Sequence, residues 1–106
     1  SRPVPNFDFM EEQVKADADD FSRTIVCMHA APYSEQFNNN VAKVFNFYTH
    51  QFPGLMCCLY GHGHHTEQND IYGDGIIYYQ VANAPKHQYY IFTITPKGYR
   101  YEIIEF

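Results

Sequence analysis

Histidines gather where one apolar run of this 106-residue chain ends. Residues Leu55–Tyr60 read LMCCLY, and the residues GHGHH follow directly. Six consecutive apolar or aromatic residues predict a buried strand, and Gly61 and Gly63 allow the backbone to turn sharply and to approach a ligand closely. His62 and His64 are two residues apart, so in an extended segment their side chains point the same way. Because neutral imidazole is the commonest metal ligand among side chains, this pattern predicts a metal site at the end of a strand.

A second predicted strand also ends at a histidine. Residues Thr24–Met28, TIVCM, are rich in β-branched side chains, and His29 follows them. A simpler interpretation exists for each feature: His29 alone fits an ordinary loop residue, and GHGHH alone fits a polar tract of the kind found in tags. Both features directly follow predicted buried strands, and this position favours a metal site instead.

The helices expected around these strands follow from apolar spacing. Residues 7–19 predict a helix that Asp8 could cap, and its acidic end fits a solvated surface better than a metal site. Residues 35–51 predict a second helix with Ser34 as its N-cap and an apolar stripe that faces the core. Three asparagines in its first turns weaken that start, so the helix could begin near Asn40.

The second helix lies between the two predicted strands and therefore makes a βαβ unit. Such units place their strands side by side and parallel, with a right-handed crossover. The carboxyl ends of both strands then meet at one edge of the sheet. We therefore expect the imidazoles of His29, His62 and His64 to converge in one cleft.

The pattern after residue 65 is that of strands in an antiparallel run. Residues 76–82, 88–95 and 99–106 each predict a strand, and Thr95-Pro96-Lys97-Gly98 predicts a hairpin turn. Gly73-Asp74-Gly75 fits a turn before the first of them. His50, at the end of the second helix, and His87, in a loop, are interpreted as structural or exposed.

Length, composition and charge exclude several classes. The size predicts one domain or part of one, and the first residue is Ser, which indicates a processed chain or a piece of a longer one. A net charge of -5 argues against general nucleic-acid binding, and no apolar run of about 18 residues predicts a membrane span. Cys27, Cys57 and Cys58 are interpreted as buried apolar fillers, which favours a reducing, cytoplasmic compartment.

The stretches VCMHAAP at residues 26–32 and LYGHGHH at residues 59–65 resemble the calcineurin-like metallophosphoesterases. The resemblance covers nearly the whole chain, from the first helix to the β-rich end. It implies an α/β fold: the C-terminal half of a four-layer α/β/β/α sandwich that ends in antiparallel strands, with the whole chain, residues 1–106, forming part of one domain.

The resemblance also implies an activity and its ligands. Members of this family hydrolyse phosphate mono- or diesters with a hydroxide held by two divalent metal ions, such as manganese, zinc or iron. By the family pattern His29 and His62 would bind the second metal and His64 the first, whereas His65 has no family role and would face outward.

The sequence departs from the family pattern upstream of His29. The family's Asp-x-His, Gly-Asp and Gly-Asn-His motifs are absent, so the bridging carboxylate, the asparagine ligand and the leaving-group histidine are missing. We therefore expect the chain to be inactive alone and to need the missing N-terminal half of the same domain. Its exposed sheet edge would otherwise be covered in a homodimer. The alternative is a non-catalytic metal-binding or protein-interaction module on the same half-fold.

Overall fold

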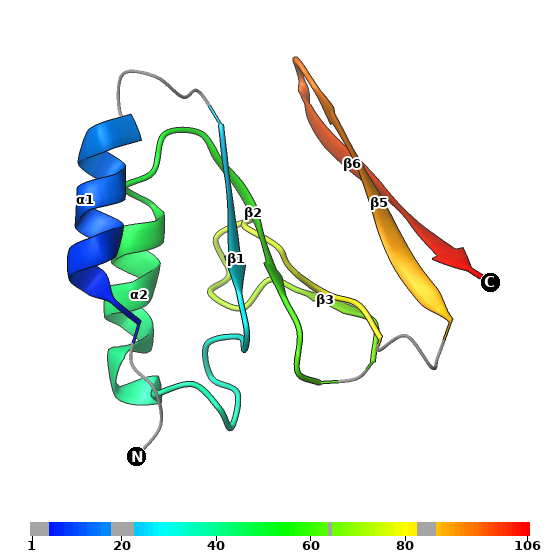
Figure 1. The fold of residues 1–106 in the computed structure, drawn as a ribbon, viewed down its shortest axis with the longest axis horizontal. Helices are drawn as coiled ribbons and strands as arrows, with labels where there is room; N and C mark the ends of the chain where they lie inside the picture. The colour runs from blue at the N-terminus through cyan, green and yellow to red at the C-terminus, as the bar shows by residue number, and fades with distance from the viewer. Residues whose placement is uncertain (1–4, 18–22, 64, 83–86) are drawn as a thin grey trace.

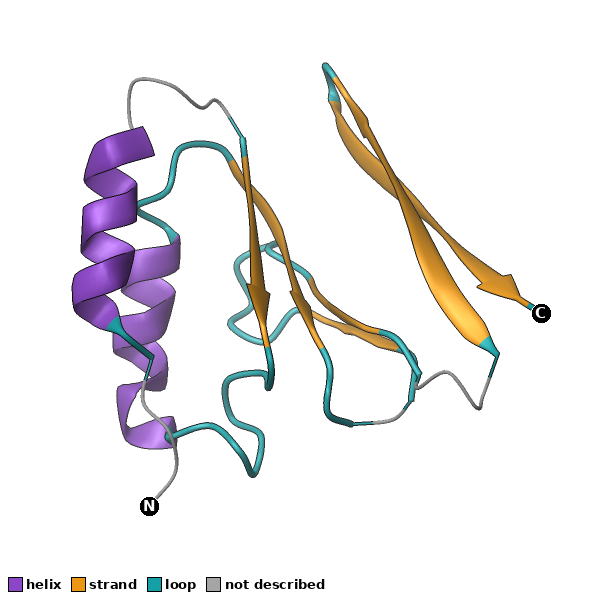
Figure 2. Ribbon diagram, in the orientation of Figure 1, coloured by secondary structure: helices purple, strands orange, loops and turns teal. Residues whose placement is uncertain are grey.

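The chain forms a mixed α/β structure in three layers. The computed structural model describes residues 5–17, 23–63, 65–82 and 87–106. Two helices cover one face of a four-stranded sheet, and a two-stranded hairpin lies on the other side (Figures 1 and 2). The elements in order are α1 (Phe7–Asp17), β1 (Thr24–Met28), the 3-10 helix η1 (Asn39–Val41), α2 (Ala42–Thr49), β2 (Leu55–Tyr60), β3 (Glu67–Asn69), β4 (Tyr78–Gln80), β5 (Gln88–Thr95) and β6 (Gly98–Glu105).

The expected βαβ unit is confirmed. Strands β1 and β2 pair in parallel, with Val26 opposite Cys58 and Met28 opposite Tyr60. Helix α2 lies between them in sequence and packs on one face of the sheet. The carboxyl ends of both strands therefore lie at the same edge, as the crossover rule requires.

The prediction that all strands after residue 65 are antiparallel is wrong for the first predicted strand, residues 76–82. Strand β4 is only three residues long and pairs in parallel with β2, while β3, which the sequence did not predict, lies antiparallel on its far side. The order in the sheet is β1-β2-β4-β3. Long-range packing decided this arrangement, because Tyr78 and Tyr79 are buried on opposite faces. The hairpin β5–β6 and its turn at Pro96-Lys97 are confirmed.

The first helix begins at Phe7 as predicted but has a different cap, and the second helix begins later than residue 35. Asn6, not Asp8, caps α1, because the side-chain oxygen of Asn6 accepts the backbone N–H of Phe9 at 3.0 Å. Helix α2 begins at Ala42, directly after η1, so the start at residue 35 is wrong and the alternative start near Asn40 is confirmed. Asn38 explains the late start, since its side chain accepts the backbone N–H of Asn40 and residues 32–37 form turns instead. Ser34 is therefore not a helix cap. The acidic residues at positions 19 and 20 lie outside the described part of the chain.

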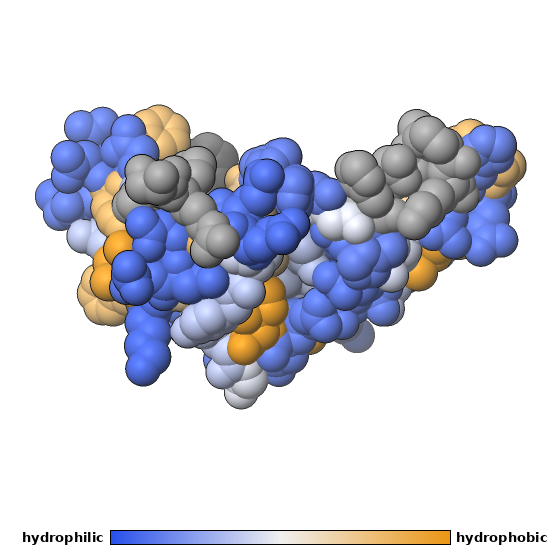
Figure 3. Space-filling view, turned by 90° about the horizontal axis from the view of Figure 1, so that it is seen from below, coloured by the Kyte–Doolittle hydropathy of each residue, from blue (hydrophilic) through white to orange (hydrophobic). Residues whose placement is uncertain are grey.

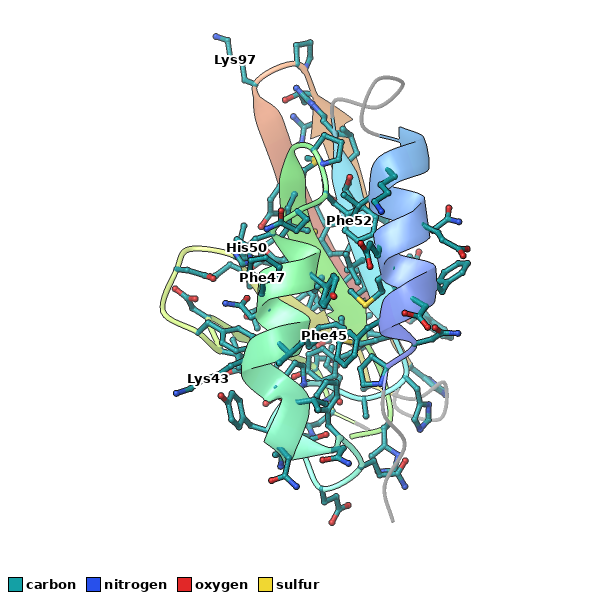
Figure 4. All side chains as sticks on the ribbon, turned by 90° about the vertical axis from the view of Figure 1, so that its left-hand side faces the viewer. Lys43, Phe45, Phe47, His50, Phe52 and Lys97 are labelled. Atoms are coloured by element: carbon teal, nitrogen blue, oxygen red, sulfur yellow. The ribbon has the colours of Figure 1, made fainter. Side chains whose placement is uncertain are left out.

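The core lies between the helices and the sheet. Tyr78 from β4 and Cys58 from β2 pack there against Phe37 and Phe45, and Tyr78 is only 1% exposed. Figure 4 shows this layer from the helix side, with Lys43 extending outward from α2. Of the apolar stripe predicted for the second helix, Phe37 and Phe45 are core, although Phe37 precedes α2, whereas Val44 is 44% exposed.

The hairpin packs on the opposite face of the sheet around one tyrosine. The ring of Tyr79 contacts four aromatic rings of the hairpin at centroid distances of 4.9–6.0 Å. Its hydroxyl lies 2.9 Å from the hydroxyl of Tyr99. Arg23, just before β1, donates to the carbonyls of Thr95 and Pro96 at the hairpin turn.

The prediction of three buried cysteines is wrong for Cys27. Cys57 and Cys58 are buried, but the side chain of Cys27 is exposed. Cys27 lies on β1, the edge strand of the sheet, on the face away from the helices, and no described segment covers it. Among the described helices, none is long and apolar enough to cross a membrane.

Candidate functional site

The structure brings two of the three predicted histidines side by side but not into one cleft: His62 lines a pocket between the loops after β1 and β2, and His29 lines a groove between β1 and α1. The imidazole rings of His29 and His62 lie with their centroids 5.2 Å apart and their planes tilted by 56°. His29 follows β1 and His62 follows β2, so the parallel pairing of these strands positions both rings. The third residue, His64, lies outside the described residues.

Backbone bonding continues past the strand ends and aligns the two residues. The N–H of Gly61 donates to the carbonyl of His29 at 3.1 Å, one step beyond the last strand pair. The backbone of His62 then has a φ of 74°, in the left-handed region that residues other than glycine seldom adopt. Such a conformation persists only where the surrounding structure holds it, and it is frequent at functional sites.

Polar side chains from the loop after β1 contact both imidazoles. Nε2 of His29 lies 3.1 Å from Oε1 of Gln36, and Nε2 of His62 lies 3.7 Å from Oε1 of Glu35. The side chain of Glu35 is 81% exposed, so this ion pair contributes little to stability. The two contacts leave the paired rings at a surface that solvent and ligands can reach.

A pocket of about 580 Å³ lies beside His62, between the loop after β1 and the loop after β2. Its wall contains a hydrogen-bonded group: the hydroxyl of Tyr60 donates to Glu67 at 2.6 Å, and Nε2 of His65 lies 3.0 Å from the other oxygen of Glu67. The bond from Tyr60, followed by those from His65 and Asn69, lowers the pKa of Glu67. His65, expected to face outward, is half exposed and also bonds Gly63, which fits a structural role.

Gln80 is the residue of this site that sequence reasoning missed. Its side chain is buried at the end of β4, and the residue is 2% exposed. Its amide oxygen accepts the N–H of Gly63 at 2.8 Å, and its amide nitrogen donates to the carbonyl of His65 at 2.8 Å. A polar residue inside the predicted strand at residues 76–82 was the available signal, but the sequence does not show what it bonds.

The end of the molecule that carries these residues is largely polar. Seen from below, it presents mostly hydrophilic residues, with hydrophobic ones in small groups (Figure 3). Within the described ranges, no group of three or more His, Cys, Asp or Glu side chains is arranged to hold a metal ion. The observed donor set is therefore a pair of imidazoles, which fits part of a metal site and requires further ligands.

Comparisons with known proteins do not assign the chain to a family. No family model, no curated protein and no solved structure matches the chain.

Proposed function

We propose that this chain is the C-terminal part of a metal-dependent phosphoesterase of the calcineurin-like type. One observation carries the proposal: His29 and His62, from the two motifs that resemble the family, meet at the carboxyl ends of adjacent parallel strands with ring centroids 5.2 Å apart. Such strand ends are where α/β sheets commonly build their sites.

The proposed roles follow from this placement. His29 and His62 would each supply one imidazole nitrogen to the second metal, and His64 would be a ligand of the first. The two divalent ions, such as manganese, zinc or iron, would supply a hydroxide nucleophile at neutral pH and stabilise the phosphate oxygens. In this chain the backbone bond from Gly61 to His29 keeps the two imidazole-bearing segments aligned. The remaining ligands, including the carboxylates that offset the metal charge, must come from elsewhere.

The open surfaces of the sheet support the second part of the proposal, a missing N-terminal half. Among described strands, β1 pairs only with β2, so its outer edge is open. A groove of about 600 Å³ runs along this edge, between β1 and α1. An open strand edge beside apolar surface is a template for pairing with another strand. The three observed layers are compatible with one half of a four-layer sandwich that the missing half completes.

A homodimer is the other way to cover this edge. Two copies that pair through β1 would hide the same backbone groups, and light scattering at high concentration would show twice the mass of one chain. A complex with the N-terminal half should replace that dimer, because both would use the same edge.

A second candidate function is a metal-binding or interaction module without catalysis. The interaction form is favoured by the outer edge of β1, which among described strands is unpaired and can therefore serve as a template for another chain. The full reading frame discriminates the two: Asp-x-His and Gly-Asp motifs upstream of Ser1 favour the enzyme, and their absence favours the module.

The experiment compares turnover by the isolated chain and by the chain joined to its upstream sequence. Both are given manganese and a generic aryl phosphate ester. We expect little or no turnover by the isolated chain, since two or three neutral imidazoles do not offset and bridge two dications. The longer protein should hydrolyse the ester, and His62→Ala should reduce its kcat/KM by a factor on the order of 100 or more.

One control variant decides what the loss of turnover means. His87→Ala, at an exposed histidine that bonds the carbonyl of Phe106, should leave turnover unchanged. Robust turnover by the isolated chain that His62→Ala does not reduce would overturn both the assignment and the claim of a missing half.

A further inference from the structure

Gln80 bridges the backbone around the histidine loop. We infer that it is a positioning residue, one that sets where the imidazole of His62 lies relative to that of His29. The inference takes its chemical meaning from the proposed function, because a metal ligand must be held in place to bind. The structural part of the inference, which residue holds the loop, does not depend on a metal.

The first support is the bonding of the Gln80 amide. Its oxygen accepts the N–H of Gly63 and its nitrogen donates to the carbonyl of His65, both at 2.8 Å. These two residues stand on either side of His64 in the sequence, and Gly63 follows His62 directly. One side chain thus takes the place of a strand partner, accepting one backbone N–H and donating to one backbone carbonyl.

The second support is burial. Gln80 is 2% exposed, and a buried amide whose polar atoms lack partners destabilises the fold. The loop conformation that supplies those partners is therefore favoured over others. The same argument explains why His62 can keep its φ of 74°, since the bond at Gly63 holds the next residue in place.

The third support is the lack of space at position 63. A Cβ built on Gly63 would lie 2.4 Å from Oε1 and 2.7 Å from Nε2 of Gln80. Both distances are shorter than those of real Cβ contacts, so a side chain at position 63 would require the end of the Gln80 side chain to shift away from its two bonds. Gly61 provides the contrast, because a Cβ there would meet its nearest neighbour, the carbonyl oxygen of His29, at an ordinary 3.9 Å.

The test replaces Gln80 by methionine in the full chain. Methionine matches glutamine in length and flexibility but cannot make either bond. In Gln80→Met we expect the amide hydrogen of Gly63 to exchange at least about tenfold faster, because its acceptor is gone. The nuclear Overhauser contact between the rings of His29 and His62 should weaken or disappear. Gln68→Met, on the neighbouring strand β3, is the matched control and should change neither signal.

A second pair of variants keeps the inference testable if Gln80→Met does not fold. Gly63→Ala should displace the loop and lower stability, whereas Gly61→Ala should be tolerated. Adding Gln80→Ala to Gly63→Ala should recover part of that stability, because the clash is with the glutamine side chain, yet should not restore the contact between the rings. This non-additive result separates positioning from a general loss of packing.

Three results discriminate the outcomes. Gln80→Met that keeps the ring contact and the slow exchange of Gly63 would overturn the inference, as would Gly63→Ala that behaves like Gly61→Ala. Cobalt binding, followed by its visible absorption, is the separate arm for the proposed function, and Gln80→Met should weaken it about 10- to 100-fold. If the wild-type chain, joined to its upstream sequence, binds no cobalt, the proposed function fails while the exchange and ring-contact results still decide the role of Gln80.

Discussion

The two faces of the four-stranded sheet differ in how completely they are covered. On the face toward the helices, Cys58 and Tyr78 are buried under Phe37 and Phe45. On the face toward the hairpin, Tyr79 of β4 is buried by aromatic rings, but Ile25 and Cys27 of the edge strand β1, on the far side of β2, are exposed. The helix face therefore holds the buried core, with a groove between β1 and α1, and the hairpin face is covered over β4 and open over β1.

The hairpin face that meets the sheet is also only partly covered. The pairs Phe92–Tyr101 and Ile94–Tyr99 lie on the hairpin face that meets Tyr79. Yet Tyr101 remains 39% exposed and Ile94 48% exposed. Exposed apolar residues on two surfaces that face each other indicate a place for further strands. This chain therefore has one well-buried core under the helices and only part of a second under the hairpin.

Substitutions on α2 test whether the helix-covered face carries most of the stability. Phe45 is 4% exposed and packs edge-on against Phe37, whereas Phe47, two residues later, is 60% exposed; both are labelled in Figure 4. We expect Phe45→Ala to lower the free energy of unfolding by about 3–5 kcal/mol, because it leaves a cavity in the core. Phe47→Ala should change it by no more than about 0.5 kcal/mol. Urea denaturation of both variants gives the comparison, and equal losses would contradict a closed core on this face.

Cysteine labelling tests the contrast between the faces directly. Burial raises the pKa of Cys57 to about 11 and that of Cys58 to about 12, so their thiolate fraction at pH 8 is very small. Because the thiolate is the nucleophile, we expect iodoacetamide to label exposed Cys27 on the order of 100-fold faster than either buried cysteine. Mass spectrometry of timed samples measures the rates. A partner that covers β1 should then protect Cys27, and labelling that stays fast in the complex would place the partner elsewhere.

The smallest expected effect on stability concerns Glu67, in the wall of the pocket beside His62. The hydrogen bond from Tyr60 is the main cause that lowers the pKa of Glu67 below its usual value of 4.5. A carboxyl group with a lowered pKa stabilises the fold above its unfolded pKa, and this contribution is lost as the pH falls through the folded value. Glu67→Gln should therefore be less stable than the wild type at pH 6, and the difference should shrink as the pH falls below about 4.5. Urea midpoints at several pH values measure it, and a constant difference would contradict this role.

The sequence by itself determined the βαβ unit and the meeting of His29 with His62. Both rest on local information: apolar runs of strand length, a helical stripe between them and the fixed hand of the crossover. The hairpin also followed from local signals, namely alternating residues and a Pro-Lys turn. Each of these predictions uses only residues that are close in the sequence or a rule on the handedness of the crossover.

Only the tertiary structure decided how the second half of the sheet is arranged and what holds the site. The parallel insertion of β4 beside β2, the exposure of Cys27 and the contact of Gln80 with Gly63 all join segments that are distant in sequence. Periodicity shows which side of a strand is apolar but not which strand is its neighbour. A buried glutamine in a strand has many potential partners, and the packing of the whole sheet selects the two that it bonds.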